Sequence, residues 1–249
     1  MDVILKDLSE DMIQSSKSAI WKGLKRKLKR KQLKDTEAKT IVQRAVGQTD
    51  FKGFQGVDVV IEAIVENMEI KQKVIKELET VCHEDFIFAS NTSSLPLTEM
   101  SKAAKKPENV IGMHYFSPVP KMPLLEIIKT DQTSEETLAT CYEIGKRQGK
   151  TCIVVNDMPG FYVNRILCPY LIEGLLMIEE GVRIEDIDGA LTSLGMPIGP
   201  ITLLDEVGID VGAHVMSGNM AQLLKGREGF KINYSMPKMF EAGLHGRKA

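Results

Sequence analysis

Short apolar runs rich in β-branched residues alternate with longer amphipathic segments through the first 156 residues. The candidate strands are 3–6, 59–63, 86–90, 110–114, 124–129 and 151–155. The candidate helices between them include 9–33, 69–82 and 134–148. This alternation predicts an α/β fold with a doubly wound sheet, and it leaves open a departure from the parallel direction in the last two strands.

The alternation stops at a cluster of turn-forming residues, Asn156-Asp157-Met158-Pro159-Gly160. Beyond this cluster the strand signals disappear and helical patterns dominate, notably at 163–180 and 185–194. We therefore expect two domains, an α/β domain over residues 1–156 and a helical domain over residues 157–249.

Composition places the chain among ordinary globular proteins, with 43% hydrophobic and 27% charged residues. A formal net charge of −2 gives no overall preference for nucleic acid or for an anionic membrane. The four cysteines lack CxxC spacing, so the sequence indicates neither a metal site nor a disulfide framework, and we expect a reducing compartment.

The strongest local charge feature is the basic segment 21–31. Its apolar residues Trp21, Leu24 and Leu28 fall on one helical face, so the cations are expected on the opposite, solvated face. Contact with anionic lipid or nucleic acid is the alternative, but no aromatic interleaving or recognised binding motif supports it. We expect no nucleic-acid partner, and membrane contact stays an unsupported alternative.

An imidazole and a carboxylate mark two neighbouring apolar runs. His114 follows the run 110–113, and Glu126 lies within the run 124–128. If the two runs are adjacent buried strands, the side chains meet at one rim of the sheet and form an acid/base pair. The carboxylate would fix the tautomer of the ring and leave its other nitrogen free to exchange a proton. The alternative is an ordinary structural histidine.

Several ordered motifs carry a family resemblance over almost the whole chain. They are ASNTSSL (89–95), GMHYFSP (112–118) and PGFYVNR (159–165). In this order they resemble the L-3-hydroxyacyl-CoA dehydrogenase family. The segments KMPLLE (121–126) and LDEVG (204–208) are most similar to its version in the multifunctional α-subunit of fatty-acid β-oxidation.

The resemblance implies an NAD-dependent oxidation of an L-3-hydroxyacyl-CoA to the 3-ketoacyl-CoA. His114 matches the catalytic histidine, and Glu126 matches its partner carboxylate. Ser93 and Asn164 match positions that contact the substrate oxygen, a role that suits a hydroxyl and an amide. Taken alone, these two residues would be assigned to a turn and a helix cap.

The resemblance also implies cofactor-binding residues. Glu66, Asn67 and Lys71 match a segment near the nicotinamide half of NAD, although a solvent-facing helix start would explain the same pattern. Asn91, in the first motif, is assigned to the cofactor as well. Asp7 ends the first candidate strand, where a carboxylate can bind both ribose hydroxyls and disfavour the extra phosphate of NADP.

A glycine turn for the pyrophosphate is missing from this pattern. G-x-G-x-x-G follows none of the candidate strands, and residues 1–7 resemble the second strand of the family. We therefore expect a Rossmann-like doubly wound sheet that lacks its first strand and glycine loop, in an N-terminally incomplete NAD-binding domain. An all-helical substrate and dimerisation domain is expected to follow it.

The expected partners are an acyl-CoA substrate and either a second copy or a larger β-oxidation complex. The expected compartment is mitochondrial in a eukaryote and cytoplasmic in a bacterium. Two alternatives stay open: a fragment of a monofunctional 3-hydroxybutyryl-CoA dehydrogenase, and a truncated, non-catalytic remnant that retains only an interaction surface. The missing glycine turn favours the latter.

Overall fold

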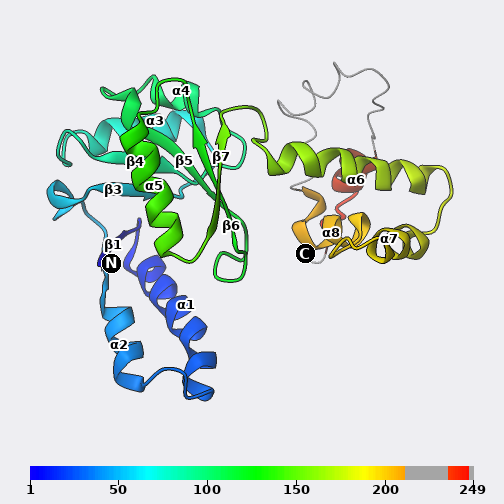
Figure 1. Ribbon diagram of the computed structural model, residues 1–249, viewed down its shortest axis with the longest axis horizontal. Coiled ribbons are helices and arrows are strands. Elements are labelled where there is room, and N and C mark those ends of the chain that lie inside the picture. The colour runs from blue at the N-terminus through cyan, green and yellow to red at the C-terminus, as the bar shows by residue number, and fades with distance from the viewer. Residues whose placement is uncertain (211–234, 247–249) are drawn as a thin grey trace.

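The computed structural model describes residues 1–210 and 235–246. It confirms the predicted order of an α/β sheet region followed by a helical region (Figure 1). The last strand, β7 (Thr151–Asn156), ends within the turn cluster, and the first helix of the helical region, α6 (Val163–Glu179), begins seven residues later.

The strands form two sheets. In the smaller sheet, β1 (Val3–Lys6) pairs in parallel with β2 (Ala45–Gln48). The larger sheet has the order β3-β4-β5-β6-β7. Its other strands are β3 (Val59–Glu62), β4 (Ile87–Ser90), β5 (Val110–Tyr115) and β6 (Leu124–Lys129). Neighbouring strands are parallel except β5 and β6, which run antiparallel. The predicted departure from the parallel direction therefore occurs at the pairing of β5 with β6.

The two sheets are separate because no strand among residues 1–210 and 235–246 joins β1 to β3. Exposed apolar side chains lie on both flanking strands, with Val3 at 50% and Ile61 at 40% exposure.

The first helical prediction, 9–33, was too long, and strand β2 was not predicted. Helix α1 (Glu10–Lys29) ends just before Lys31, whose φ of 56° is left-handed, and α2 (Asp35–Gln43) follows. β2 holds only four residues and has one large apolar side chain. A Cβ at Gly47 would lie 2.1 Å from the side chain of Ile13, so glycine allows α1 to pack closely on β2.

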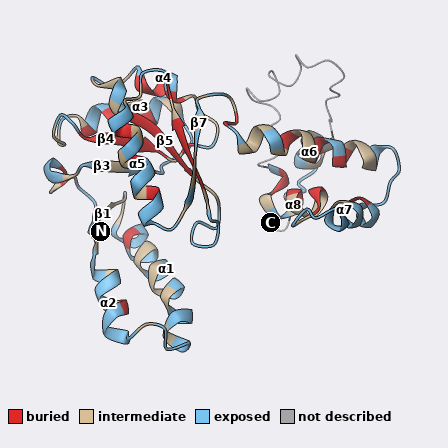
Figure 2. Cartoon of the chain, in the orientation of Figure 1, coloured by how far each residue is buried: buried red, intermediate tan, exposed pale blue. Residues whose placement is uncertain are grey.

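Helices cover both faces of the larger sheet and bury its central strands (Figure 2). On one face lie α3 (Met68–Leu78) and α4 (Leu97–Ser101). On the other lies α5 (Glu135–Arg147), through Cys141. Short 3₁₀ helices, η1 (Phe54–Gly56) and η2 (Pro107–Asn109), precede β3 and β5. All four residues of β4 are buried, as expected for a parallel strand covered on both sides.

The helical region has its own apolar core. Besides α6 it contains α7 (Ile184–Ser193), α8 (Pro200–Val207) and α11 (Ser235–Glu241). The core is centred on α6, where Ile172 is fully buried. No helix in the described part of the chain is long and apolar enough to cross a membrane.

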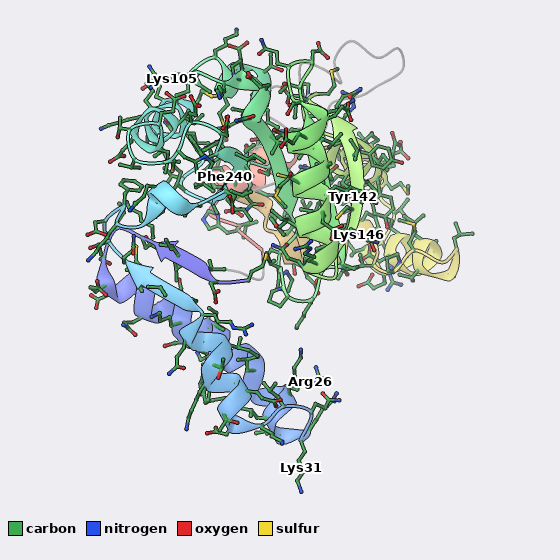
Figure 3. The ribbon with its side chains drawn as sticks, turned by 60° about the vertical axis from the view of Figure 1, so that its left-hand side comes forward. Arg26, Lys31, Lys105, Tyr142, Lys146 and Phe240 are labelled. Carbon is green, nitrogen blue, oxygen red and sulfur yellow. The ribbon has the colours of Figure 1, made fainter. Side chains whose placement is uncertain are left out.

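The basic segment lies in the C-terminal half of α1 and the turn after it. Trp21, Leu24 and Leu28 are partly buried while the cations between them are exposed, as the sequence predicts. Arg26 and Lys31 point away from the ribbon at the far end of this helix (Figure 3).

Candidate active site

The antiparallel pairing of β5 and β6 brings the predicted acid/base pair together. His114 and Glu126 are directly opposite in the register, and the ring Nδ1 lies 2.7 Å from Glu126 Oε2. His114 is 6% exposed and Glu126 is fully buried. Each strand thus supplies one side chain to the same face of the sheet, so a buried, charge-assisted hydrogen bond can form.

The second oxygen of Glu126 receives two backbone donors from the start of the helical region. The amides of Tyr162 and Val163 donate to Oε1 at 3.0 and 2.9 Å. These amides open helix α6, where unpaired N–H groups and the helix dipole favour a carboxylate. One buried carboxylate therefore holds both the imidazole and the first helix of the second domain.

This arrangement assigns the tautomer of His114. An ionised Glu126 only accepts hydrogen bonds, so Nδ1 carries the hydrogen and Nε2 keeps its lone pair. Nε2 makes no hydrogen bond within the part of the chain that the structure describes. The rings of Phe116 and Phe161 flank the imidazole, with centroids at 4.5 and 5.8 Å. Nε2 is thus available as a base beside apolar walls.

The two predicted substrate-binding residues also meet. Asn164, near the start of α6, donates through Nδ2 to the backbone oxygen of Ser93 at 3.3 Å. Ser93 is exposed on the loop after β4, and its hydroxyl has no hydrogen-bond partner among the described residues. The structure places these side chains together, while their contact with substrate stays a prediction.

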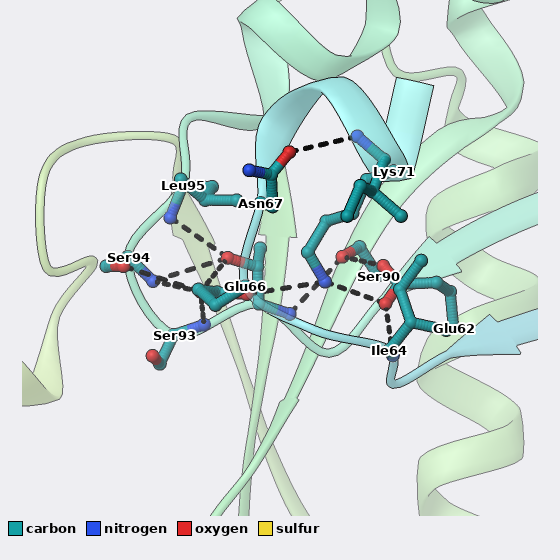
Figure 4. A network of polar contacts seen from close by, with 11 residues as sticks. Glu62, Ile64, Glu66, Asn67, Lys71, Ser90, Ser93, Ser94 and Leu95 are labelled. Carbon is teal, nitrogen blue, oxygen red and sulfur yellow. Dashed lines mark hydrogen bonds and ion pairs between the residues drawn. The ribbon is translucent and has the colours of Figure 1, made fainter. Parts of the chain in front are cut away.

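Glu66 organises this loop (Figure 4). Its Oε1 accepts hydrogen bonds from the Thr92 hydroxyl at 2.6 Å and from the amides of Ser93 and Ser94 at 3.0 and 3.3 Å. Burial raises the pKa of Glu66, but hydrogen bonds and the charge of Lys71 outweigh it and hold the pKa below its ordinary value of 4.5. Glu66 is therefore a carboxylate that fixes backbone.

Lys71 lies in the first turn of α3, but its side chain faces away from solvent. Its side chain is 1% exposed, and its ammonium lies 2.7 Å from Glu62 Oε1 and 3.3 Å from Glu66 Oε2. Glu62, which was not predicted, is buried at the end of β3 (Figure 4). A glutamate that closes a run of three apolar strand residues is the signal that could have identified it.

Asn91 and Asp7 lie in different surroundings. Asn91 follows β4 and accepts a hydrogen bond from the Tyr115 amide at 2.8 Å, and no residue in the described part of the chain accepts a hydrogen bond from its NH₂ group. Asp7 follows β1 in the smaller sheet, where it accepts from the Leu8 amide at 2.7 Å. In residues 1–210 and 235–246, no hydrogen bond or ion pair joins Asp7 to the other candidate residues.

An open pocket of about 480 Å³ lies at the carboxyl ends of β3, β4 and β5. Its lining residues are mainly apolar: Ile61, Ala63, Asn91, Tyr115, Val119, Pro120, Gln148 and Lys150. The carboxyl ends of parallel strands are the usual place for a dinucleotide. Apolar walls with a free carboxamide fit the nicotinamide half of NAD, and a carboxylate after β1 fits a ribose diol. No glycine-rich turn joins a strand to a helix in the described residues.

Cysteine and metal chemistry find no support in the described residues. Burial raises the pKa of Cys141 to about 12 and that of Cys168 to about 11, so both thiols are neutral. No group of three or more metal-ligating side chains occurs in the part of the chain described.

Comparisons with known proteins show which family the chain resembles. Residues 1–158 match the NAD binding domain of 3-hydroxyacyl-CoA dehydrogenase, and residues 160–249 match its C-terminal domain. Together these matches span nearly the whole chain.

Solved structures of this kind are also similar. (S)-3-Hydroxybutyryl-CoA dehydrogenase from Ralstonia eutropha is 34% identical with a TM-score of 0.93, over 100% of this chain and 88% of that one. For 3-hydroxybutyryl-CoA dehydrogenase from Escherichia coli the identity is 30% and the TM-score 0.93, over 99% and 52% of the two chains. The dehydrogenase part of a multifunctional enzyme from C. elegans is 25% identical with a TM-score of 0.63, over 100% of this chain and 55% of that one. The chain belongs to the 3-hydroxyacyl-CoA dehydrogenase family, and its first domain is an NAD-binding domain.

Proposed function

We propose that the chain oxidises an L-3-hydroxyacyl-CoA to the 3-ketoacyl-CoA with NAD, as the dehydrogenase module of fatty-acid β-oxidation. The observation that carries this proposal is the buried pair of His114 and Glu126, 2.7 Å apart, in the paired strands β5 and β6. A base with a free nitrogen and a fixed tautomer is what removal of a hydroxyl proton requires.

The proton transfer is assigned to the imidazole. His114 accepts the hydroxyl proton of the substrate at Nε2 and becomes an imidazolium. Glu126 stabilises this cation through Nδ1, and it needs no movement because α6 already fixes its second oxygen. NAD, when bound, supplies the acceptor for the hydride that leaves the substrate carbon. Phe116 and Phe161 limit water around the ring.

Ser93 and Asn164 are assigned to the substrate oxygen. The Ser93 hydroxyl is exposed and free to donate, and Asn164 has a second amide hydrogen besides the one bonded to the Ser93 carbonyl. Donors at this position stabilise the oxygen as a ketone forms. Because the two residues belong to different domains, the substrate site depends on how α6 is docked.

Asp7, Asn91 and Glu66 are assigned to the cofactor. Asp7 would hold the ribose hydroxyls, while the free amide of Asn91 and the exposed part of Glu66 lie on the nicotinamide side. We assign Lys71 an indirect role, because a side chain with 1% exposure cannot reach a ligand from this position. It acts through Glu66.

A short-chain enzyme is the second candidate. The similarity to the R. eutropha 3-hydroxybutyryl-CoA dehydrogenase, at 34% identity over 100% of the chain, favours it. Purified chain would be assayed by NADH absorbance with 3-hydroxybutyryl-CoA and with 3-hydroxypalmitoyl-CoA. Preference for the long substrate supports the β-oxidation module, and preference for the short one supports the alternative.

The non-catalytic alternative is tested separately, by calorimetric titration of the same protein with NADH. Binding together with oxidation of either substrate supports the proposal. A folded chain that binds no NADH and oxidises neither substrate overturns it and favours an interaction role.

A further inference from the structure

Glu62 takes no part in the chemistry proposed above, yet it is among the most completely satisfied charges in the described structure. Its carboxylate accepts hydrogen bonds from Lys71 Nζ, from the Ser90 hydroxyl and from the Ile64 amide, each at 2.7 Å. Its side chain is 2% exposed. A buried carboxylate needs such partners because burial without them is strongly unfavourable.

Lys71 connects Glu62 to the loop that carries Ser93. The ammonium is shared between two carboxylates, at 2.7 Å from Glu62 and 3.3 Å from Glu66. Glu66 then holds Ser93 and Ser94 through their backbone amides (Figure 4). A continuous set of charge-assisted contacts therefore runs from the end of β3 to the loop after β4.

We propose that Glu62 is a positioning residue for this loop. By anchoring the ammonium of Lys71, it sets the place of Glu66, and Glu66 in turn holds the backbone that presents Ser93. The effect of Glu62 on substrate binding rests on the function proposed above, because it assumes that Ser93 contacts the substrate. The effect of Glu62 on the position of the loop does not depend on that function.

The geometry indicates how the anchor works. With Glu62 in place, the ammonium has one partner on each side, so it does not draw Glu66 off the loop amides. If Glu62 becomes neutral, the buried ammonium has only Glu66 as a counter-charge, and the shorter ion pair that results moves the carboxylate toward Lys71. The hydrogen bonds to Ser93 and Ser94 then lengthen.

A purely structural ion pair would behave differently. In that case Glu62 only neutralises Lys71 within the core, and removing both charges together restores normal behaviour everywhere. A positioning residue does not allow this rescue, because Glu66 then lacks the cation that orients it. The variants Glu62→Gln and Glu62→Gln/Lys71→Met separate the two explanations.

Hydrogen–deuterium exchange of the full chain gives the first readout. In both variants the amides of Ser93 and Ser94 should exchange roughly tenfold faster than in the wild type. The control is Thr137→Val, which removes the hydroxyl of a residue that is 1% exposed at the start of α5, outside this network. It should leave exchange at the loop unchanged.

Kinetics give the second readout, in the direction of ketoacyl-CoA reduction and of hydroxyacyl-CoA oxidation. Both variants should lower kcat/KM for the acyl-CoA roughly tenfold. If the wild type oxidises no substrate, the proposed function fails, and the exchange data alone still decide the role of Glu62.

The proposal would be overturned if the Ser93 and Ser94 amides of Glu62→Gln exchanged at the wild-type rate. It would also be overturned if their exchange returned to the wild-type rate in the double variant. If Glu62→Gln does not fold, Glu62→Asp decides, because it keeps the buried charge but moves it away from Lys71. Fast loop exchange in the Glu62 single variant that folds, with an unchanged Thr137→Val control, supports the positioning role.

Discussion

Glu126→Gln tests the pair at the centre of the site, because an amide cannot satisfy all the donors that the carboxylate accepts. Glu126 receives two backbone N–H groups on one oxygen and faces His114 Nδ1 with the other. A glutamine has one accepting oxygen and one donating NH₂. At this fully buried position, one of its two orientations leaves the backbone amides without an acceptor, and the other requires the ring to change its tautomer.

The size of the effect follows from comparing these orientations. If the NH₂ group faces Tyr162 and Val163, two part-buried backbone amides lose their acceptor, at about 1–3 kcal/mol each. If it faces His114, the ring shifts its hydrogen to Nε2 and satisfies the amide. The second orientation is therefore favoured by at least about 2 kcal/mol, which is roughly thirtyfold.

A ring with hydrogen on Nε2 cannot accept the substrate proton. Loss of the carboxylate charge beside the imidazolium adds roughly another tenfold, because charge-assisted hydrogen bonds are about twice as strong as neutral ones. We expect Glu126→Gln to lower turnover by about two to three orders of magnitude. NADH affinity should change little.

The assay is NADH formation from a 3-hydroxyacyl-CoA, with nitrogen NMR of the His114 ring to identify the tautomer. Thermal denaturation checks that the variant is folded, and Thr137→Val serves again as a destabilised control. Turnover within a few fold of the wild type, or a ring that keeps its hydrogen on Nδ1, would refute the reasoning.

Three further predictions concern His114, Glu66 and Asp7. His114→Gln should lower turnover by about two to four orders of magnitude with NADH binding unchanged by calorimetry, since it removes the base; a smaller loss would assign the proton transfer elsewhere. Because the pKa of Glu66 is lowered on folding, its stabilising contribution is present above 4.5 and is lost as pH falls through the lower folded value. The free energy of unfolding, measured by urea denaturation at a series of acid pH values, should therefore fall less steeply with falling pH in Glu66→Gln than in the wild type. Equal slopes would contradict this. Asp7→Ala should weaken NADH binding roughly tenfold and raise the affinity for NADPH relative to that for NADH. An unchanged ratio of the two affinities would exclude a contact of Asp7 with the ribose.

Much of the sheet could be predicted because its central strands, β4, β5 and β6, are buried on both faces. Runs such as Val110–Tyr115 and Leu124–Lys129 are continuous and apolar, and their register brings His114 opposite Glu126 as expected. Pairing of the two chemical groups follows from strand adjacency, which periodicity indicates well.

Other features depend on contacts that a linear pattern does not contain. Strand β2 was missed because Gly47 is selected by the close approach of Ile13, a residue more than thirty positions away. Lys71 carries the pattern of an exposed helix start, but two carboxylates from separate positions in the chain make its burial favourable. Tertiary pairing overrides the local signal in both cases.

The binding of the start of α6 by Glu126 could not be predicted from the sequence either. The motifs indicate a carboxylate beside the histidine, but only the fold shows that the first amides of α6 bind its other oxygen. The left-handed Phe161, with φ of 49°, turns the chain so that these amides face β6. Domain docking and imidazole orientation thus share one residue.

Isotope transfer tests the central claim most directly, because it follows the reacting hydrogen itself. The full chain would be incubated with NAD and an L-3-hydroxyacyl-CoA that carries deuterium on the hydroxyl-bearing carbon, and the products analysed by mass spectrometry. The account predicts 3-ketoacyl-CoA together with NADH that contains the deuterium, and neither product with His114→Gln. Ketone formed without deuterium in the NADH, or equal yields from the variant, would contradict it.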